Sequence, residues 1–327
     1  MTRLGFVGDV MLGRQVDDKQ RSRSVEAVWG DCLDFLREFD GLFANLECCL
    51  SDRGQPWRRT DHTFHFRADP EWAVPALERA GVDCCALANN HVLDFETEAL
   101  LDTLDALDDG GIAHSGAGRT RDDALDPAVV TADGLDVAFV SLTDNTPEYA
   151  ATDSASGTAH VEIDVENPET RATVEEALAR ADATDPDLVV ASLHWGPNMV
   201  VSPPARFRAF AKWFVDSGVD VVHGHSAHVF QGVEVYDGAP ILYDTGDFVD
   251  DYAVDATLRN DRGFCFEVVV KGGAPATLRL HPTEIEDCAV REATDEAAVW
   301  SRERMRERSE PFGTSFDRDG DALVLSL

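Results

Sequence analysis

The chain has 327 residues, of which 44% are hydrophobic, and its 62 acidic residues outnumber 28 basic ones to give a formal net charge of −34 at pH 7. This charge argues against a nucleic-acid partner, and no apolar run approaches the roughly 20 residues that a membrane span needs. Lysine occurs only at Lys19, Lys212 and Lys271. Because acidic residues spread along a whole chain repel one another unless salt screens them, we interpret the composition as halophilic.

Two features predict a cytoplasmic location. The first ten residues, MTRLGFVGDV, lead almost directly into a strand-like alternation and lack the charged start, apolar stretch and cleavage site of a signal peptide. The seven cysteines include adjacent pairs at 48–49 and 84–85 but no CxxC spacing. We therefore expect them to be small buried thiols in a reducing compartment.

Apolar segments that alternate with helical spacing predict an α/β fold. The expected strands are 4–7, 41–46, 82–88, 136–142, 187–193 and 219–222, and the expected helices are 71–80, 96–107, 169–181 and 205–216. After residue 230, short strands separated by turns predict an antiparallel sheet packed on the first sheet. A helix near 295–308 and the strand ALVLSL close the chain. We expect residues 1–290 to form one domain and 291–327 to pack on it.

The early strands share one property, which is that each ends in a residue able to bind a metal ion or transfer a proton. These residues are Asp9, Glu47, Asn90 with His91, His194, and His225 with His228. In α/β proteins, ligands bind at the carboxyl ends of the strands. Taken singly, each residue is more often a turn former or a hydrogen-bonded structural side chain. Taken jointly, the carboxylates, amide and imidazoles suit Mn, Fe or Zn, and a pair of such ions suits phosphoryl transfer.

Six motifs resemble the CapA family of poly-γ-glutamate capsule biosynthesis proteins, which is related to the calcineurin-like metallophosphoesterases. The motifs are GDVMLGR (8–14), ANLE (44–47), ANNHVLDF (88–95), HWG (194–196), GHSAHVFQG (224–232) and YDTGDF (243–248). They occur in the family's order over about residues 3–250. The resemblance implies a two-sheet β-sandwich flanked by helices, with one or two divalent metal ions at the strand ends.

The resemblance also implies roles for single residues. Positions that match metal ligands are Asp9, Glu47, Asn90, His194, His225 and His228. His91 matches a histidine that acts as general acid or stabilises the leaving group. Asp94 and Asp247 match positions that could orient a histidine, although Asp94 could instead cap the next helix. Met11 stands where metallophosphoesterases have a histidine, which predicts that one metal site is weaker or absent.

Arginine is concentrated in residues 52–70, DRGQPWRRTDHTFHFRADP, the densest positive patch of the sequence. Arg58, Arg59 and Arg67 could bind a carboxylate or phosphate of a substrate, or they could pair with neighbouring acidic residues on a surface loop. Arg14 follows GDVMLG and is close in sequence to Asp9. We expect it at the site, either as a contact for an anion or in a salt bridge.

Two functions are compatible with these residues. The first is a metal-dependent hydrolase of the phosphoesterase type that acts on an anionic small molecule or polymer, with His91 and Arg14 as catalytic residues. The second is an accessory protein of capsule synthesis that holds an anionic polymer at the same metal site without cleaving it. Met11 favours the second function, whereas the Asn90–His91 pair favours the first.

Overall fold

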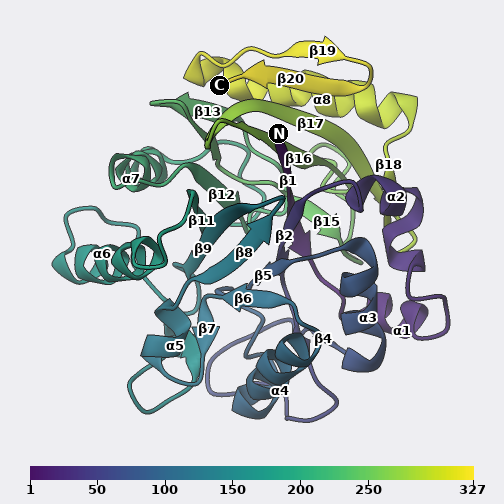
Figure 1. Ribbon diagram of the computed structural model, residues 1–327. Coiled ribbons are helices and arrows are strands. Elements are labelled where there is room, and N and C mark those ends of the chain that lie inside the picture. Colours follow the sequence, from purple (N-terminus) through teal and green to yellow (C-terminus); the bar gives the residue numbers. More distant parts are fainter.

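Two large β-sheets organise the chain in the computed structural model, which describes residues 1–327 (Figure 1). The ten-stranded sheet contains β19 (Asp317–Asp319), β20 (Ala322–Ser326), β17 (Ala274–Glu286), β16 (Arg262–Lys271), β1 (Thr2–Val10), β2 (Gly41–Leu46), β5 (Cys84–Ala86) and β6 (Ala113–Ser115), with β15 (Asp247–Val249) on β1 and β18 (Ala289–Glu292) on β17. The six-stranded sheet contains β13 (Val233–Tyr236), β14 (Ala239–Leu242), β12 (Val221–His225), β11 (Leu188–His194), β9 (Leu135–Thr143) and β8 (Ala128–Ala132). The short pairs are β3 (Cys49–Leu50) with β4 (Arg67–Ala68), and β7 (Ala117–Gly118) with β10 (Gly157–Thr158).

Helices cover the outer faces of both sheets. The α-helices are α1 (Arg14–Gln20), α2 (Leu33–Leu36), α3 (Pro70–Ala80), α4 (Glu96–Asp109), α5 (Arg121–Leu125), α6 (Pro168–Asp182), α7 (Ala205–Asp216) and α8 (Asp295–Ser309). Short 3-10 segments span Ala27–Cys32, Pro147–Tyr149 and Glu310–Phe312, and the first of them has a kink at Gly30. Figure 1 shows α6 and α7 beside the six-stranded sheet and α1 to α4 on the opposite side of the molecule. The long helices expected from the sequence are all present, with ends within two residues of the prediction.

The alternation of side chains between the two faces of each strand determines which residues lie between the sheets. On β9, Val137 and Phe139 pack in the cluster that joins the two sheets, whereas Ala138 and Val140 pack against the helices. β1 contributes Leu4 and Phe6 to the same inter-sheet cluster. Because side chains alternate with a period of two, each central strand adds one row of residues to the interface between the sheets.

The expectation of one sheet with a second, antiparallel sheet packed on it is wrong in its partition of the strands. β1, β2 and β5 belong to the ten-stranded sheet, whereas β9, β11 and β12 form the centre of the six-stranded sheet. The late strands do not form a sheet of their own, because β16 pairs with the edge of β1 and β14 pairs with the edge of β12. The free edges of the parallel strands therefore recruit the later hairpins into both sheets.

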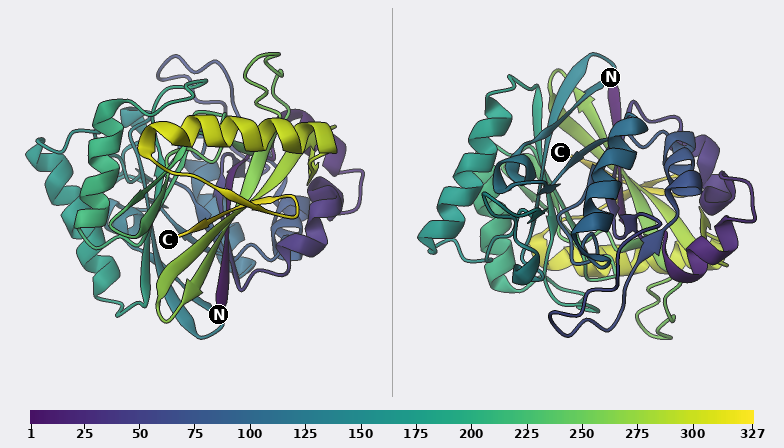
Figure 2. Two further views of the ribbon diagram at one scale, coloured as in Figure 1. Left: turned by 90° about the horizontal axis from the view of Figure 1, so that it is seen from above. Right: turned by 90° about the horizontal axis from the view of Figure 1, so that it is seen from below.

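The C-terminal residues lie against these late strands. β20 pairs with β17, and α8 contacts β13, β16 and β17. Figure 2 shows α8 crossing the end of the sheets as one long helix. All seven cysteines are buried and unpaired, as expected from their spacing. No helix of the structure is long and apolar enough to cross a bilayer.

Candidate metal centre

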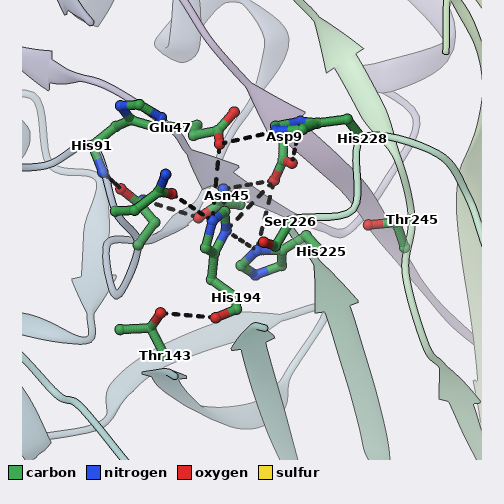
Figure 3. Close-up of polar contacts among 12 residues, drawn as sticks. Asp9, Asn45, Glu47, His91, Thr143, His194, His225, Ser226, His228 and Thr245 are labelled. Atoms are coloured by element: carbon green, nitrogen blue, oxygen red, sulfur yellow. Dashed lines mark hydrogen bonds and ion pairs between the residues drawn. The ribbon is translucent and has the colours of Figure 1, made fainter. Parts of the chain in front are cut away.

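The polar strand ends meet between the two sheets (Figure 3). In the strand register, Asp9 on β1 is opposite Asn45 on β2 and Asp247 on β15. In the other sheet, His194 on β11 is opposite His225 on β12. The carboxyl ends of the central strands therefore bring these side chains to one edge of the sandwich, in agreement with the sequence-based expectation.

Two groups of possible metal ligands form there, and they share one residue. The first group is Asp9, His194 and His225, and the second is Asp9, Glu47, His228 and Asp247. Within each group, one donor atom from every residue lies within 4.8 Å of the others, and all of these residues are buried. A carboxylate common to both groups is the arrangement that would allow it to bridge two ions.

Each carboxylate of the second group has one oxygen that accepts no hydrogen bond. These oxygens are Asp9 Oδ2, Glu47 Oε1 and Asp247 Oδ2, and all three are buried. The remaining oxygens are bonded, since Asn45 Nδ2 donates to Asp9 Oδ1 at 2.8 Å and the Tyr252 hydroxyl donates to Glu47 Oε2 at 3.1 Å. Burying an unpaired carboxylate is costly, so the three convergent oxygens fit a divalent cation as their missing partner.

The imidazoles of the first group face each other. His194 Nδ1 lies 2.9 Å from His225 Nδ1, and Ser192 Oγ lies 2.9 Å from His225 Nε2. Burial lowers the pKa of His194 to about 3 and holds the pKa of His225 well below its ordinary value. Both rings are therefore neutral at pH 7, which is the form that binds metal ions.

His228 lies on a loop with an unusual backbone. Ser226 and His228 have φ angles of 111° and 58°, in the left-handed region that non-glycine residues rarely adopt. Asp244 holds this loop because its Oδ2 accepts a hydrogen bond from the Ala227 N–H at 2.7 Å. His228 Nδ1 then lies 2.8 Å from Asp247 Oδ1. Such strain accumulates at functional sites, where the surrounding contacts maintain it.

The turn after β5 places Asn90 and His91 beside the same centre. Asn89 fixes this turn, because its Nδ2 donates to the Leu46 carbonyl at 2.8 Å and its Oδ1 accepts from the His91 N–H at 3.0 Å. Asn90 Oδ1 lies 2.8 Å from His194 Nε2, so the amide reaches the first group. The structure thus brings together all six residues expected to ligate a metal ion.

His91 and Asp94 form a buried pair. His91 Nδ1 lies 2.6 Å from Asp94 Oδ2, which also accepts from the Phe66 N–H at 2.7 Å. Asp94 does not cap the following helix, because α4 has Phe95 at its N-cap and no side-chain cap bond. The aspartate is therefore placed to orient the histidine, which was one of the two roles expected from the sequence.

His223 lies near the centre but does not belong to it. Its Nδ1 is 3.2 Å from Ser192 Oγ, and its Nε2 is 3.1 Å from the Val7 carbonyl. Both ring nitrogens of His223 therefore have polar neighbours inside the core between the sheets, two residues before His225 on the same strand. Met11 is also turned away, since it is fully buried and its Sδ accepts a hydrogen bond from the Gly13 N–H at 3.1 Å.

A pocket of about 370 Å³, which we call the site pocket, opens beside His91 and His228. Arg14, Phe64, Phe66 and Tyr252 also line it. Sequence reasoning missed Tyr252, because it follows the last recognised motif. It also missed Asn45, although Asn45 precedes Glu47 by two residues and side chains two residues apart on a strand lie on the same face.

The arginines have different positions. Arg14 lines the site pocket and is paired with Asp251, whose Oδ1 lies 2.7 Å from Nη2. Arg58, Arg59 and Arg67 do not line it. Arg59 pairs with Glu96 and Arg67 lies over the Phe95 ring, whereas Arg58 is exposed. The structure therefore does not bring these three arginines to the centre.

Comparison with known proteins gives a consistent result. The family model described as bacterial capsule synthesis protein PGA_cap matches residues 3–252. A probable polyglutamine synthesis accessory protein of Mycobacterium tuberculosis is 31% identical over 299 residues, which cover 87% of this chain and 77% of the relative. The capsule biosynthesis protein CapA of Bacillus anthracis is 28% identical, covering 98% of this chain and 77% of the relative. The PGA biosynthesis protein CapA of Bacillus subtilis is 27% identical, covering 75% of this chain and 62% of the relative.

Proposed function

The chain belongs to the bacterial capsule synthesis protein family PGA_cap, which is the CapA family, and we propose a function for it on that basis. The proposed function is that of a metal-dependent hydrolase of the phosphoesterase type. The observation that carries the proposal is the presence of three buried carboxylate oxygens that accept no hydrogen bond beside the neutral imidazoles of His194 and His225, at one edge of the sandwich. Two packed sheets with outer helices support a calcineurin-like architecture, with residues 1–290 as its domain and 291–327 packed on it. The halophilic character and cytoplasmic location stay predictions.

One or two divalent ions would be held by the residues of the two groups together with Asn90. These residues are Asp9, Glu47, His194, His225, His228 and Asp247. Mixed carboxylate and imidazole donors suit Mn, Fe or Zn. Such an ion supplies Lewis acidity, which stabilises negative charge on a phosphoryl oxygen. Asp247 offers the second group a carboxylate, although Met11 offers it no ligand.

His91 is the proposed general acid. Asp94 occupies its Nδ1, which leaves Nε2 as the nitrogen available to a substrate in the site pocket. In the reaction, a water oxygen bonds to phosphorus, the bond from phosphorus to the leaving oxygen breaks, and His91 Nε2 gives that oxygen its proton. The proton that the water loses passes to solvent, and His91 is reprotonated from solvent.

Arg14 is the proposed anion contact. Its Nε and Nη2 face Asp251, at 3.2 Å from Oδ2 and 2.7 Å from Oδ1. This fork holds the guanidinium in place and leaves Nη1 to donate to a non-reacting oxygen of the substrate. The role rests on geometry that a lysine would not reproduce.

The similarity to a probable polyglutamine synthesis accessory protein of Mycobacterium tuberculosis favours a second candidate function. In this alternative the chain is an accessory protein of anionic polymer synthesis that binds a metal ion at the same centre without hydrolysis. Both candidates predict metal binding, so turnover is the property that separates them.

The test compares metal content and phosphodiester hydrolysis in the wild type, His91→Ala and His225→Ala, with Mn at high salt. We expect His91→Ala to keep its metal and fold but to lose about 10²–10⁴-fold in turnover, the usual scale for a general acid. His225→Ala should lower metal occupancy first. His114→Ala is the matched control, because His114 is bonded to Asp108 outside the centre.

Loss of metal in His91→Ala would show that the histidine is a ligand and not the acid. A wild type that retains metal yet hydrolyses no member of a broad ester panel would favour the accessory function.

A further inference from the structure

The site pocket has mainly apolar walls although the whole chain is strongly acidic. Phe64, Phe66, Met199 and Tyr252 line it together with the buried His91 and His228, and His228 belongs to the metal centre. No aspartate or glutamate lines it, and Arg14 is its single arginine or lysine. The pocket therefore offers a ligand much apolar surface and one permanent positive charge.

Arg14 is held among aromatic rings. Its guanidinium carbon lies 5.3 Å from the ring centres of both Phe64 and Phe66 and 5.8 Å from that of Tyr252. These contacts and the ion pair with Asp251 hold the guanidinium in place. One anionic group of a ligand can reach the remaining donors, but a row of anionic groups finds no further cations in the pocket.

The mouth of the pocket is apolar as well. Two of the exposed large hydrophobic residues of the structure line this pocket. They are Phe64 at 57% exposure and Met199 at 38%. Exposed apolar side chains that gather at one opening mark a place where an apolar group binds.

The neighbouring arginines do not extend the pocket into a groove for a polyanion. Arg53 pairs with Asp102, Arg59 pairs with Glu96, and Arg67 donates to the Arg53 carbonyl at 2.7 Å. Each of the first two charges is already compensated by a carboxylate. Arg58 is exposed but does not line the pocket, so a chain with an anionic group on every unit meets no arginine or lysine inside the pocket other than Arg14.

We propose that the site pocket takes a compact ligand in which an aromatic or aliphatic group is joined to a single anionic group, and that it excludes extended polyanions. This assignment rests on the proposed metal-dependent function, since the anionic group would be next to the metal centre. The apolar part would pack against Phe64 and Met199, and Arg14 would contact an anionic oxygen.

The experiment measures binding to the Mn-loaded protein by calorimetry. The probes are phenylphosphonate, methylphosphonate, free glutamate and a ten-unit γ-linked glutamate oligomer. We expect phenylphosphonate to bind about 10-fold more tightly than methylphosphonate, because its ring leaves water for the apolar walls. The oligomer should bind no more tightly than free glutamate.

Phe64→Ala should reduce the preference for phenylphosphonate to about 3-fold or less, because it removes part of the wall that covers the ring. Val299→Ala is the control, since Val299 on α8 is 46% exposed and does not line the pocket. Three results would overturn the assignment. They are equal affinities for the two phosphonates, tighter binding of the oligomer than of free glutamate, and an unchanged preference for phenylphosphonate in both Phe64→Ala and Met199→Ala. The hydrolase proposal fails separately, through absence of ester turnover in a protein that retains metal and this preference.

Discussion

Two buried glutamates of this protein have opposite surroundings. Glu267 on β16 and Glu47 after β2 are only 2% and 0% exposed. Glu267 Oε1 lies 2.6 Å from Arg3 Nε, and Oε2 lies 2.7 Å from His281 Nε2. Burial raises the pKa of Glu267, but His281 and Arg3 outweigh it and lower the pKa to about 2. Burial and the Asp9 carboxylate instead hold the pKa of Glu47 well above its ordinary value.

The difference shows what the metal centre lacks. Both carboxyl groups have lost their water, so the direction of each pKa shift depends on whether a cation replaces it. Glu267 has the Arg3 guanidinium beside it. Glu47, Asp9 and Asp247 form ion pairs only with histidines, and no arginine or lysine pairs with them. Three buried carboxylates without an arginine or lysine beside them are suited to a bound metal ion.

The largest effect on metal binding should come from removing the carboxylate shared by both ligand groups. Asp9→Asn keeps the size of the side chain and removes its charge. We expect Mn affinity to fall by more than about 100-fold, because the loss of a residue that only orients a metal ligand usually costs up to about 100-fold. Titration calorimetry measures the loss. Glu267→Gln is the control and should keep wild-type affinity, and unaltered affinity in Asp9→Asn would contradict the centre as described.

Glu267→Gln tests whether the ionised Glu267 carboxylate stabilises the fold. A folded-state pKa of about 2 against an ordinary value of 4.5 means that the unfolded chain binds the proton more tightly. The ionised glutamate therefore stabilises the fold fully above about pH 4.5, and this contribution disappears as the pH falls towards about 2. We expect Glu267→Gln to cost about 2–3 kcal/mol at pH 7. Urea unfolding should show the cost shrinking between pH 4.5 and 3, and a cost that grows on acidification would refute this account.

Metal addition should distinguish the two glutamates by a smaller effect. Mn at about 100 times its Kd stabilises the folded state by about 2.7 kcal/mol, so the thermal midpoint of the metal-free wild type should rise by about 5 °C. Glu47→Gln should lose most of this rise, and Glu267→Gln should retain it. Scanning calorimetry with Mn and with a chelator measures both, and equal rises in the two variants would remove the distinction.

Salt should have the smallest effect on the difference between wild type and Glu267→Gln. Exposed acidic charges are screened at high ionic strength, so the midpoints of both proteins should rise as KCl increases from about 0.1 M to 2 M. The free-energy difference between them should change by less than about 0.5 kcal/mol, because a buried pair is screened much less. A midpoint independent of KCl would contradict the halophilic interpretation.

The long helices, the central strands and most residues of the centre could be predicted from the sequence. Asp9, Glu47, His194 and His225 follow or end apolar strands, and such strand ends meet wherever parallel strands share an edge. The six motifs similarly located the family, since their order along the chain is itself sequence information. Periodicity and strand-end chemistry are local properties, so they can be read without coordinates.

The division of these strands between two sheets, and the neighbours of each polar residue, could not be predicted from the sequence because both depend on contacts between distant segments. Asp247 joins the ligand groups because β15 pairs with β1 opposite Asp9, a contact across more than two hundred residues of sequence. His223 is excluded because β1 offers it the Val7 carbonyl. Arg59 is directed to Glu96 on α4 and not to the pocket. Hydrogen bonds and ion pairs between distant segments depend on register and packing, and neither is encoded in the spacing of residues along one strand.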